Sequence, residues 1–205
     1  MGRFSSGAGT AEAPPRLDDA PRARPRARWL PTVTVAVVIL VTTMGGWVLA
    51  AALAKPAGRP VGFPGIVLVQ PLSGWEEAGR QEVGGAPFVR LTRGGGNLDV
   101  VAVTPFTGTS EDLAGAYVDR VLRSQLDQLS VSHRTSSVTL DDGLRGLRFT
   151  YVGVASGTSQ SIEGEVTVVV GAAGNGVVFD GWAPEGLLVY VEGDQHTMVS
   201  RAEVA

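Results

Sequence analysis

The sequence predicts an α+β protein: an antiparallel sheet packed with one long amphipathic helix and a C-terminal helix, preceded by a single transmembrane helix. Three observations carry this prediction. Residues 29–54 form a run of 26 residues without a charge. Beyond it, short apolar or alternating runs between glycine-rich turns are typical of strands. One segment, residues 110–130, has apolar side chains at helical spacing instead.

The uncharged run is long enough to cross a membrane. A bilayer core of about 30 Å takes roughly 20 apolar residues as a helix. A cleaved signal peptide is the alternative, because Ala52, Leu53 and Ala54 before Lys55 fit an A-x-A cleavage site. The apolar part, residues 33–54, is longer than the 7–15 residues or so of a signal-peptide core, which favours a retained anchor.

The flanks of this run predict its orientation. Only Lys55 and Arg59 follow it closely, whereas residues 16–28, directly before it, contain five arginines: Arg16, Arg22, Arg24, Arg26 and Arg28. The arginine-rich side stays in the cytoplasm, so we expect a single-pass protein of the cell membrane with an extracytoplasmic C-terminal domain. Residues 1–28, rich in Pro, Ala, Arg and Gly, read as a disordered basic cytoplasmic tail, and residues 55–65 read as a linker.

Charge and cysteine content narrow the function classes. Residues 61–205 carry nine Lys/Arg against seventeen Asp/Glu, so the expected exported part is acidic. Nucleic acid is therefore not expected as a partner, because phosphate backbones need a basic surface. The chain has no cysteine, so the domain must be stabilised by packing without disulfides.

The predicted domain, residues 66–203, opens with strands. Residues 66–69 form a short apolar run, followed by a turn at residues 71–75. Residues 88–93 and 98–104 are two further strands around the glycine-rich residues 94–97. No Lys-Ser/Thr follows these glycines, so a hairpin turn is favoured over a phosphate-binding loop.

One long helix is predicted over residues 110–130. Thr109 or Ser110 can cap its start, and Glu111 and Asp112 suit the positive end of the helix dipole. Its apolar stripe should lie on the sheet and consists of Leu113, Tyr117, Val118, Val121, Leu122, Leu126 and Leu129.

Three more strands and a terminal helix complete the domain. The strands are predicted at residues 147–154, 161–170 and 177–182, and the helix at residues 184–199. Residues 161–170 alternate clearly. Ile162, Val166, Val168 and Val170 lie on one side, and Ser161, Glu163, Glu165 and Thr167 lie on the other. The second side is predicted to be an exposed acidic surface.

The sequence has few residues in patterns that are typical of an active site. His133 and His196 are the two histidines, and they form no metal-ligand spacing. No G-x-S-x-G element supports a hydrolase triad. We therefore expect no catalytic residue, no metal and no cofactor, and a protein that is not an enzyme. An envelope enzyme that uses Ser, Asp and one of the histidines is the alternative.

Several short motifs carry a family resemblance. They are Pro71, Gly74 and Trp75, the turn at residues 143–146 before Phe149 and Tyr151, Gly164 inside a strand, and Met198, Val199 and Ser200. With the order of elements, they make residues 64–203 resemble the PsbP-like α/β/α sandwich superfamily, and within it the actinobacterial LpqN-type cell-envelope proteins. Those lipoproteins carry a lipid-bearing cysteine, which this chain lacks. The resemblance implies a non-catalytic accessory or binding role at the envelope.

The sequence thus predicts a membrane-anchored, extracytoplasmic binding module of the bacterial cell envelope. Its partner would be a protein or an envelope component. The candidate partner-binding residues are Trp75, Glu163 and Glu165. An accessory subunit of a secretion system or another membrane complex is a second interpretation of the same features.

Overall fold

The computed structural model describes residues 58–205. The predicted cytoplasmic tail, the predicted transmembrane helix at residues 29–54 and the first three residues of the predicted linker lie outside the described residues. Within residues 58–205, no helix has the length and apolar character needed to cross a membrane.

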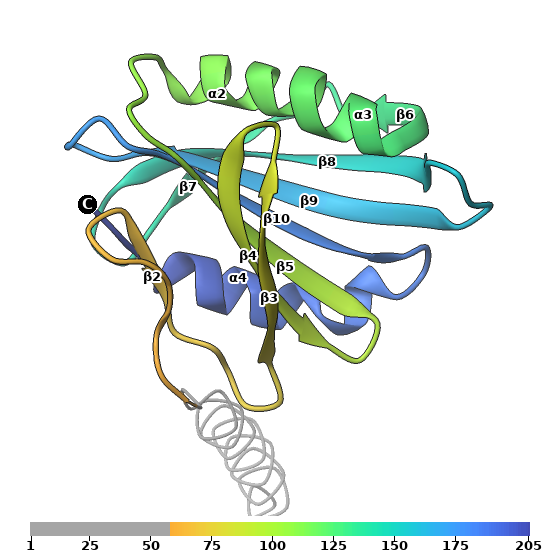
Figure 1. The fold of residues 1–205 in the computed structure, drawn as a ribbon, viewed down its shortest axis with the longest axis horizontal. Coiled ribbons are helices and arrows are strands. Elements are labelled where there is room, and N and C mark those ends of the chain that lie inside the picture. The colour runs from red at the N-terminus through yellow and green to blue at the C-terminus, as the bar shows by residue number, and fades with distance from the viewer. Residues whose placement is uncertain (1–57) are drawn as a thin grey trace, which may run out of the picture. The chain divides into compact units, whose positions relative to one another are not determined.

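A large antiparallel sheet organises the described part of the chain (Figure 1). Seven strands run in the order β3-β4-β5-β10-β9-β8-β6, and an eighth, β7, pairs with β8. Their bounds are β3 Glu76–Val83, β4 Ala86–Arg93, β5 Gly96–Val103, β6 Leu126–Val131, β7 Ser136–Thr139, β8 Arg145–Ala155, β9 Ser161–Val170 and β10 Gly176–Pro184. The hairpin β4–β5 and the meander β8–β9–β10 lie where the sequence predicts them.

Three strands of the large sheet were not predicted. β3 reads EEAGRQEV and has no buried residue, because this edge strand is open to solvent on both faces. β6 and β7 follow one another along the outer edge of β8. Edge strands of this kind carry a weak hydrophobic pattern, so periodicity does not reveal them.

A second, three-stranded sheet is formed by β1 (Val61–Phe63), β2 (Val67–Val69) and β11 (Glu203–Val204). A Cβ atom at Gly62 would lie 2.3 Å from the carbonyl oxygen of Val67, so only glycine fits this tight hairpin. β1 lies in the segment assigned to the linker from sequence. The folded domain therefore begins before Ile66.

The predicted long helix is shorter than expected. Helix α2 (Ser110–Tyr117) begins at Thr109, whose side chain forms a capping box with Asp112. It continues through a π-helical turn, η1 (Val118–Leu122), into α3 (Arg123–Gln125). The prediction of helix up to residue 130 is wrong, because Leu126 adopts extended backbone angles and starts β6. Leu126 is buried as a strand residue and also fits the spacing of the helical stripe, so the apolar stripe alone does not reveal where the helix ends.

Helices cover both faces of the large sheet (Figure 1). Helix α2 packs on one face over the α2-side core, which includes Phe88, Val101, Leu113, Tyr117, Leu122, Phe149, Val166, Val168 and Val178. Helix α4 (Glu192–Ser200) follows the 3-10 turn η2 (Leu188–Tyr190) on the other face, over the α4-side core. That core includes Trp75, Val89, Leu91, Val100, Val169, Phe179, Met198 and Val199, and it also takes in the three-stranded sheet. The C-terminal helix thus begins eight residues later than predicted.

Candidate functional site

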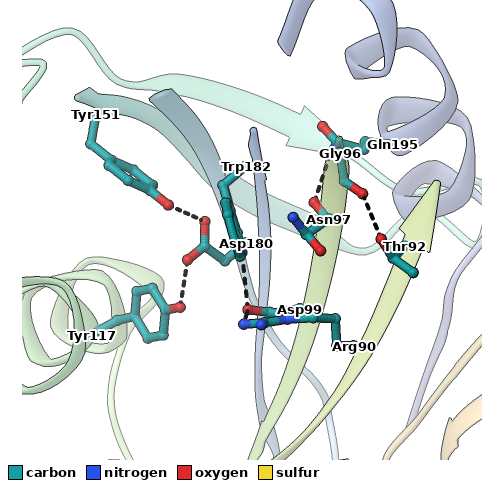
Figure 2. Close-up of polar contacts among 10 residues, drawn as sticks. All are labelled: Arg90, Thr92, Gly96, Asn97, Asp99, Tyr117, Tyr151, Asp180, Trp182 and Gln195. Atoms are coloured by element: carbon teal, nitrogen blue, oxygen red, sulfur yellow. Dashed lines mark hydrogen bonds and ion pairs between the residues drawn. The ribbon is translucent and has the colours of Figure 1, made fainter. Parts of the chain in front are cut away.

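A polar network lies buried between α2 and the sheet (Figure 2). Asp180 on β10 points toward the helix and is only 3% exposed. The hydroxyl group of Tyr117, from α2, donates to its Oδ2 atom at 2.7 Å. The hydroxyl group of Tyr151, from β8, donates to Oδ1 at 2.9 Å. One carboxyl group therefore ties the helix and two strands together.

An ion pair lies beside this carboxyl group. Arg90 on β4 donates from Nε and Nη2 to the two carboxylate oxygens of Asp99, at 2.6 and 2.7 Å. The indole N–H of Trp182 donates to the same carboxylate at 3.1 Å, and the Arg90 guanidinium lies 5.0 Å from the Trp182 ring centroid. Asp99 and Asp180 are direct neighbours across β5 and β10, so the two carboxyl groups repel one another when both are charged.

This environment sets the protonation state of the network. Burial, together with the nearby charge of Asp99, raises the pKa of Asp180 from 3.8 to about 7. The two tyrosine hydrogen bonds and Arg90 oppose this rise. Burial likewise raises the pKa of Tyr117 and Tyr151 well above 10, so both stay protonated and act as donors. Asp180 therefore titrates near neutral pH.

Gly164 explains how the Tyr151 ring reaches Asp180. A Cβ atom at this position of β9 would lie 2.4 Å from Cζ of Tyr151, so any other residue would displace the ring. Gly164 is one of the residues that carry the family resemblance. Its requirement here comes from the packing of this aromatic ring.

The buried polar groups of this network are all hydrogen-bonded. Within residues 58–205, every buried side-chain nitrogen or oxygen has a hydrogen-bond partner, and no group of three or more His, Cys, Asp or Glu residues is arranged to hold a metal. A cavity of about 140 Å³ adjoins the network and is lined by residues that include Arg90, Tyr151, Gln160, Asp180 and Trp182. Both Asp180 oxygens already accept hydrogen bonds from tyrosines. The arrangement therefore favours a structural role, in which the network fixes α2 to the sheet.

Large apolar side chains are exposed in one loop between β10 and α4. Leu187, Val189 and Tyr190 are 43%, 63% and 78% exposed, and we call residues 187–190 the apolar loop. Glu163 on β9 holds this loop, because its Oε1 atom accepts hydrogen bonds from the backbone N–H groups of Gly186 at 2.9 Å and Leu188 at 3.0 Å.

The three candidate residues named from sequence lie on the α4 side of the sheet. Trp75 is 4% exposed in the α4-side core, and its indole N–H donates to Asp194 at 3.0 Å. Glu165 is half-buried and pairs with Arg148 and His196. The prediction of an exposed acidic strand face is wrong, because α4 and the apolar loop cover that face. Of the three residues, Glu163 is the one that contacts the backbone of the exposed apolar loop.

Sequence reasoning missed the polar network entirely. Asp99 and Asp180 each interrupt a run of apolar residues, LDVVAV in β5 and VVFD in β10. Burying a carboxylate in an otherwise apolar strand costs free energy unless the carboxylate is hydrogen-bonded. An aspartate in such a strand therefore indicates a buried hydrogen-bond partner. The apolar loop has no equivalent signal, since its exposure depends on where α4 begins.

Comparisons with known proteins bear on the fold. No protein-family model matches this sequence, and no curated protein matches it. Among solved structures, the cyanobacterial PsbP (CyanoP) from Synechocystis sp. PCC 6803 matches with a TM-score of 0.51 and 15% identity, over 72% of this chain and 92% of that one. The chain has the PsbP-like fold.

Two further structures match less closely. LpqN of Mycobacterium tuberculosis, described as involved in cell envelope biogenesis, matches with a TM-score of 0.49 and 11% identity, over 72% of this chain and 90% of that one. The Ran-binding protein Mog1p of Saccharomyces cerevisiae matches with a TM-score of 0.46 and 10% identity, over 73% and 96%. The expected PsbP-like fold is confirmed by the match to CyanoP.

Proposed function

We propose that this protein is a single-pass, membrane-anchored accessory module of the cell envelope, whose extracytoplasmic domain docks a partner protein through the apolar loop and performs no catalysis. The observation that carries the proposal is the exposure of Leu187, Val189 and Tyr190 in one short, fixed loop. Adjacent exposed apolar side chains are typical of protein interaction sites, and tyrosine is enriched among residues that dominate binding.

The fixed conformation of the loop favours binding. The two backbone hydrogen bonds to Glu163 hold the loop, and Leu188 packs against the α4-side core. A loop that is already ordered loses less conformational entropy when a partner binds it. Glu163 therefore contributes to docking as a positioning residue.

The charges around the loop indicate which kind of surface on a partner would complement it. Glu185 precedes the loop, Glu192 follows it, and both side chains are exposed. A partner with an apolar pocket and a basic rim would complement this surface. An anionic lipid surface would be repelled by the same carboxylates, so a protein is the better fit.

Copurification tests the docking surface. The tagged full-length chain would be isolated from its own membranes after mild crosslinking, and bound proteins would be quantified for wild type, Val189→Asp and Gln125→Asp. Gln125 is the matched control, because it is exposed on α3, on the other face of the sheet, and its substitution adds the same charge. We expect Val189→Asp to lose a partner that Gln125→Asp retains. Equal recovery with both variants would contradict docking through the loop.

The anchor and its orientation rest on the sequence flanks. Protease added to intact protoplasts should remove the domain and leave a small protected N-terminal fragment. A protected domain would reverse the orientation, and a secreted product that starts at Lys55 would establish a cleaved signal peptide instead.

The absence of catalysis is tested separately. We expect a His133→Ala/His196→Ala double variant to support the same cellular function as wild type. Loss of function with an intact fold would favour the alternative of an envelope enzyme.

A further inference from the structure

A groove of about 400 Å³ opens on the α2 side of the sheet, away from the apolar loop. Its walls are the β3–β4 hairpin, the start of the β5–α2 connection and one face of α2. Its volume lies within the range of about 300–1,000 Å³ that is typical of small-molecule sites. No lining residue belongs to the apolar loop, so the groove is a separate feature of the molecule.

Most of the side chains that line the groove are apolar. Its floor consists of buried side chains from the α2-side core, among them Val101, Leu113 and Val178. Its walls add half-buried apolar side chains: Val83, Ala86, Val103, Phe106 and Ala116. Partly exposed apolar walls around a buried apolar floor gain free energy when a hydrocarbon chain covers them.

One cation lies at the hairpin end of the groove. A Cβ atom built on Gly84 would lie 3.9 Å from Cβ of Arg120 and 3.3 Å from Cγ2 of Val121, so this arginine stands beside the Gly84–Gly85 turn. Arg120 is exposed, and no carboxylate in residues 58–205 pairs with it. In contrast, Arg123, one turn further along, pairs with Asp119 at 3.0 Å.

We propose that this groove binds the single apolar chain of an anionic amphiphile, with the carboxylate head group paired to Arg120. The volume suits one chain, the lining suits hydrocarbon, and the unpaired arginine supplies the charge that complements the head group. A charged site at only one end fixes the direction of the chain. The proposal does not depend on docking through the apolar loop.

Photocrosslinking of the full-length chain in phosphatidylcholine nanodiscs tests the proposal. The probe is dodecanoate with a diazirine near the end of its chain, and mass spectrometry locates the labelled peptides. We expect label on residues 83–87, 103–106 or 116–121. Unlabelled dodecanoate should compete, and dodecanol, which lacks the charge, should compete at least tenfold less well.

Paired variants separate the chain contact from the head-group contact. Arg120→Gln should lower the labelling three- to tenfold at a subsaturating probe concentration, whereas Arg123→Gln should leave it unchanged. Ala116→Trp should fill the groove and abolish labelling, whereas Glu111→Trp, outside the groove on the same helix, should not. Val189→Asp should label like wild type, so failure here and failure of the docking proposal are distinguishable.

Three results would overturn the proposal. The first is label confined to residues outside the groove, and the second is equal competition by dodecanol and dodecanoate. The third is equal labelling of the Arg120→Gln and Arg123→Gln variants. The two arginine variants change exposed side chains only and should not disturb the fold. They therefore test the proposal even if Ala116→Trp fails to fold.

Discussion

The two faces of the large sheet are built from different chemistry. The α4 side is a continuous apolar layer that joins strands β4, β5 and β10 to α4 and to the three-stranded sheet. The α2 side has an apolar core of its own, but it also holds the Asp180 network, the Arg90–Asp99 ion pair and two cavities. The polar contacts of the α4 side, such as Trp75 with Asp194 and Glu165 with Arg148 and His196, lie around an apolar core, whereas the α2-side core encloses a hydrogen-bonded carboxyl group.

The comparison shows where the fold can respond to its surroundings. Close-packed apolar layers change little with pH or ligand, because they contain no titratable group. A buried carboxyl group near neutral pKa and a groove open to ligand both lie under α2. The exposed apolar loop, where we propose docking, lies on the α4 side, and Leu188 packs against its apolar core.

The largest effect is expected in the α4-side core. Phe179 is among the most fully buried large side chains, and Phe179→Ala should lower the free energy of unfolding by about 3–5 kcal/mol. Denaturant unfolding of residues 58–205, which should be cooperative in the wild type, measures this. A loss below about 1 kcal/mol would mean that the α4 side is not close-packed.

A smaller effect is expected on the α2 side and depends on pH. Because the folded-state pKa of Asp180 is raised, its protonated form stabilises the fold, and this stability is lost as pH rises from about 4 toward 7. Between pH 5 and 7 the wild type should lose about 2 kcal/mol relative to Asp180→Asn, at a slope of at most about 1.4 kcal/mol per pH unit. Parallel pH profiles for the two proteins would exclude Asp180 as the titrating group.

Removal of Glu163 should have a weaker effect on stability. Glu163→Ala leaves the N–H groups of Gly186 and Leu188 without their acceptor, at a cost of about 1 kcal/mol because the site is half exposed. Hydrogen exchange at these two amides should accelerate, while exchange in α2 stays unchanged. Unchanged protection at Gly186 and Leu188 would show that Glu163 does not fix the loop.

The smallest effect is expected at the exposed surface of the helix. Asp119→Ala removes an ion pair with Arg123 in which both side chains are largely exposed. Such pairs contribute little, so the change in unfolding free energy should stay within about 0.5 kcal/mol. A thermal melt beside Glu163→Ala gives the direct comparison, and a larger loss for Asp119→Ala would reverse our ranking of the two carboxylates.

The elements with strong local signals were predictable from sequence. The hairpin β4–β5 follows from apolar runs around a glycine turn, and β9 follows from its alternation. The start of α2 at Thr109 follows from its cap. The end of the helix was not predictable, because Leu126 is buried as a strand residue and also fits the spacing of the helical stripe.

The candidate site could not be predicted from local sequence patterns, because it depends on which strands pair and in which register. Asp99 and Asp180 become neighbours only through the register of β5 and β10, and Tyr117 joins them from α2. From sequence, Glu163 was chosen as a possible partner-binding residue on an exposed acidic strand face. Its actual contact is with the backbone of a loop more than twenty residues away in sequence.

The most direct test of the account places a photocrosslinking amino acid at Tyr190 in the full-length chain, with Gln125, exposed on α3 on the other face of the sheet, as the matched position. Light-induced adducts in living cells would be compared for both positions, with and without Glu163→Ala. The account predicts one partner adduct from position 190, weakened by Glu163→Ala, and none of that identity from position 125. The same adduct from both positions, or no adduct at position 190, would contradict docking through the apolar loop.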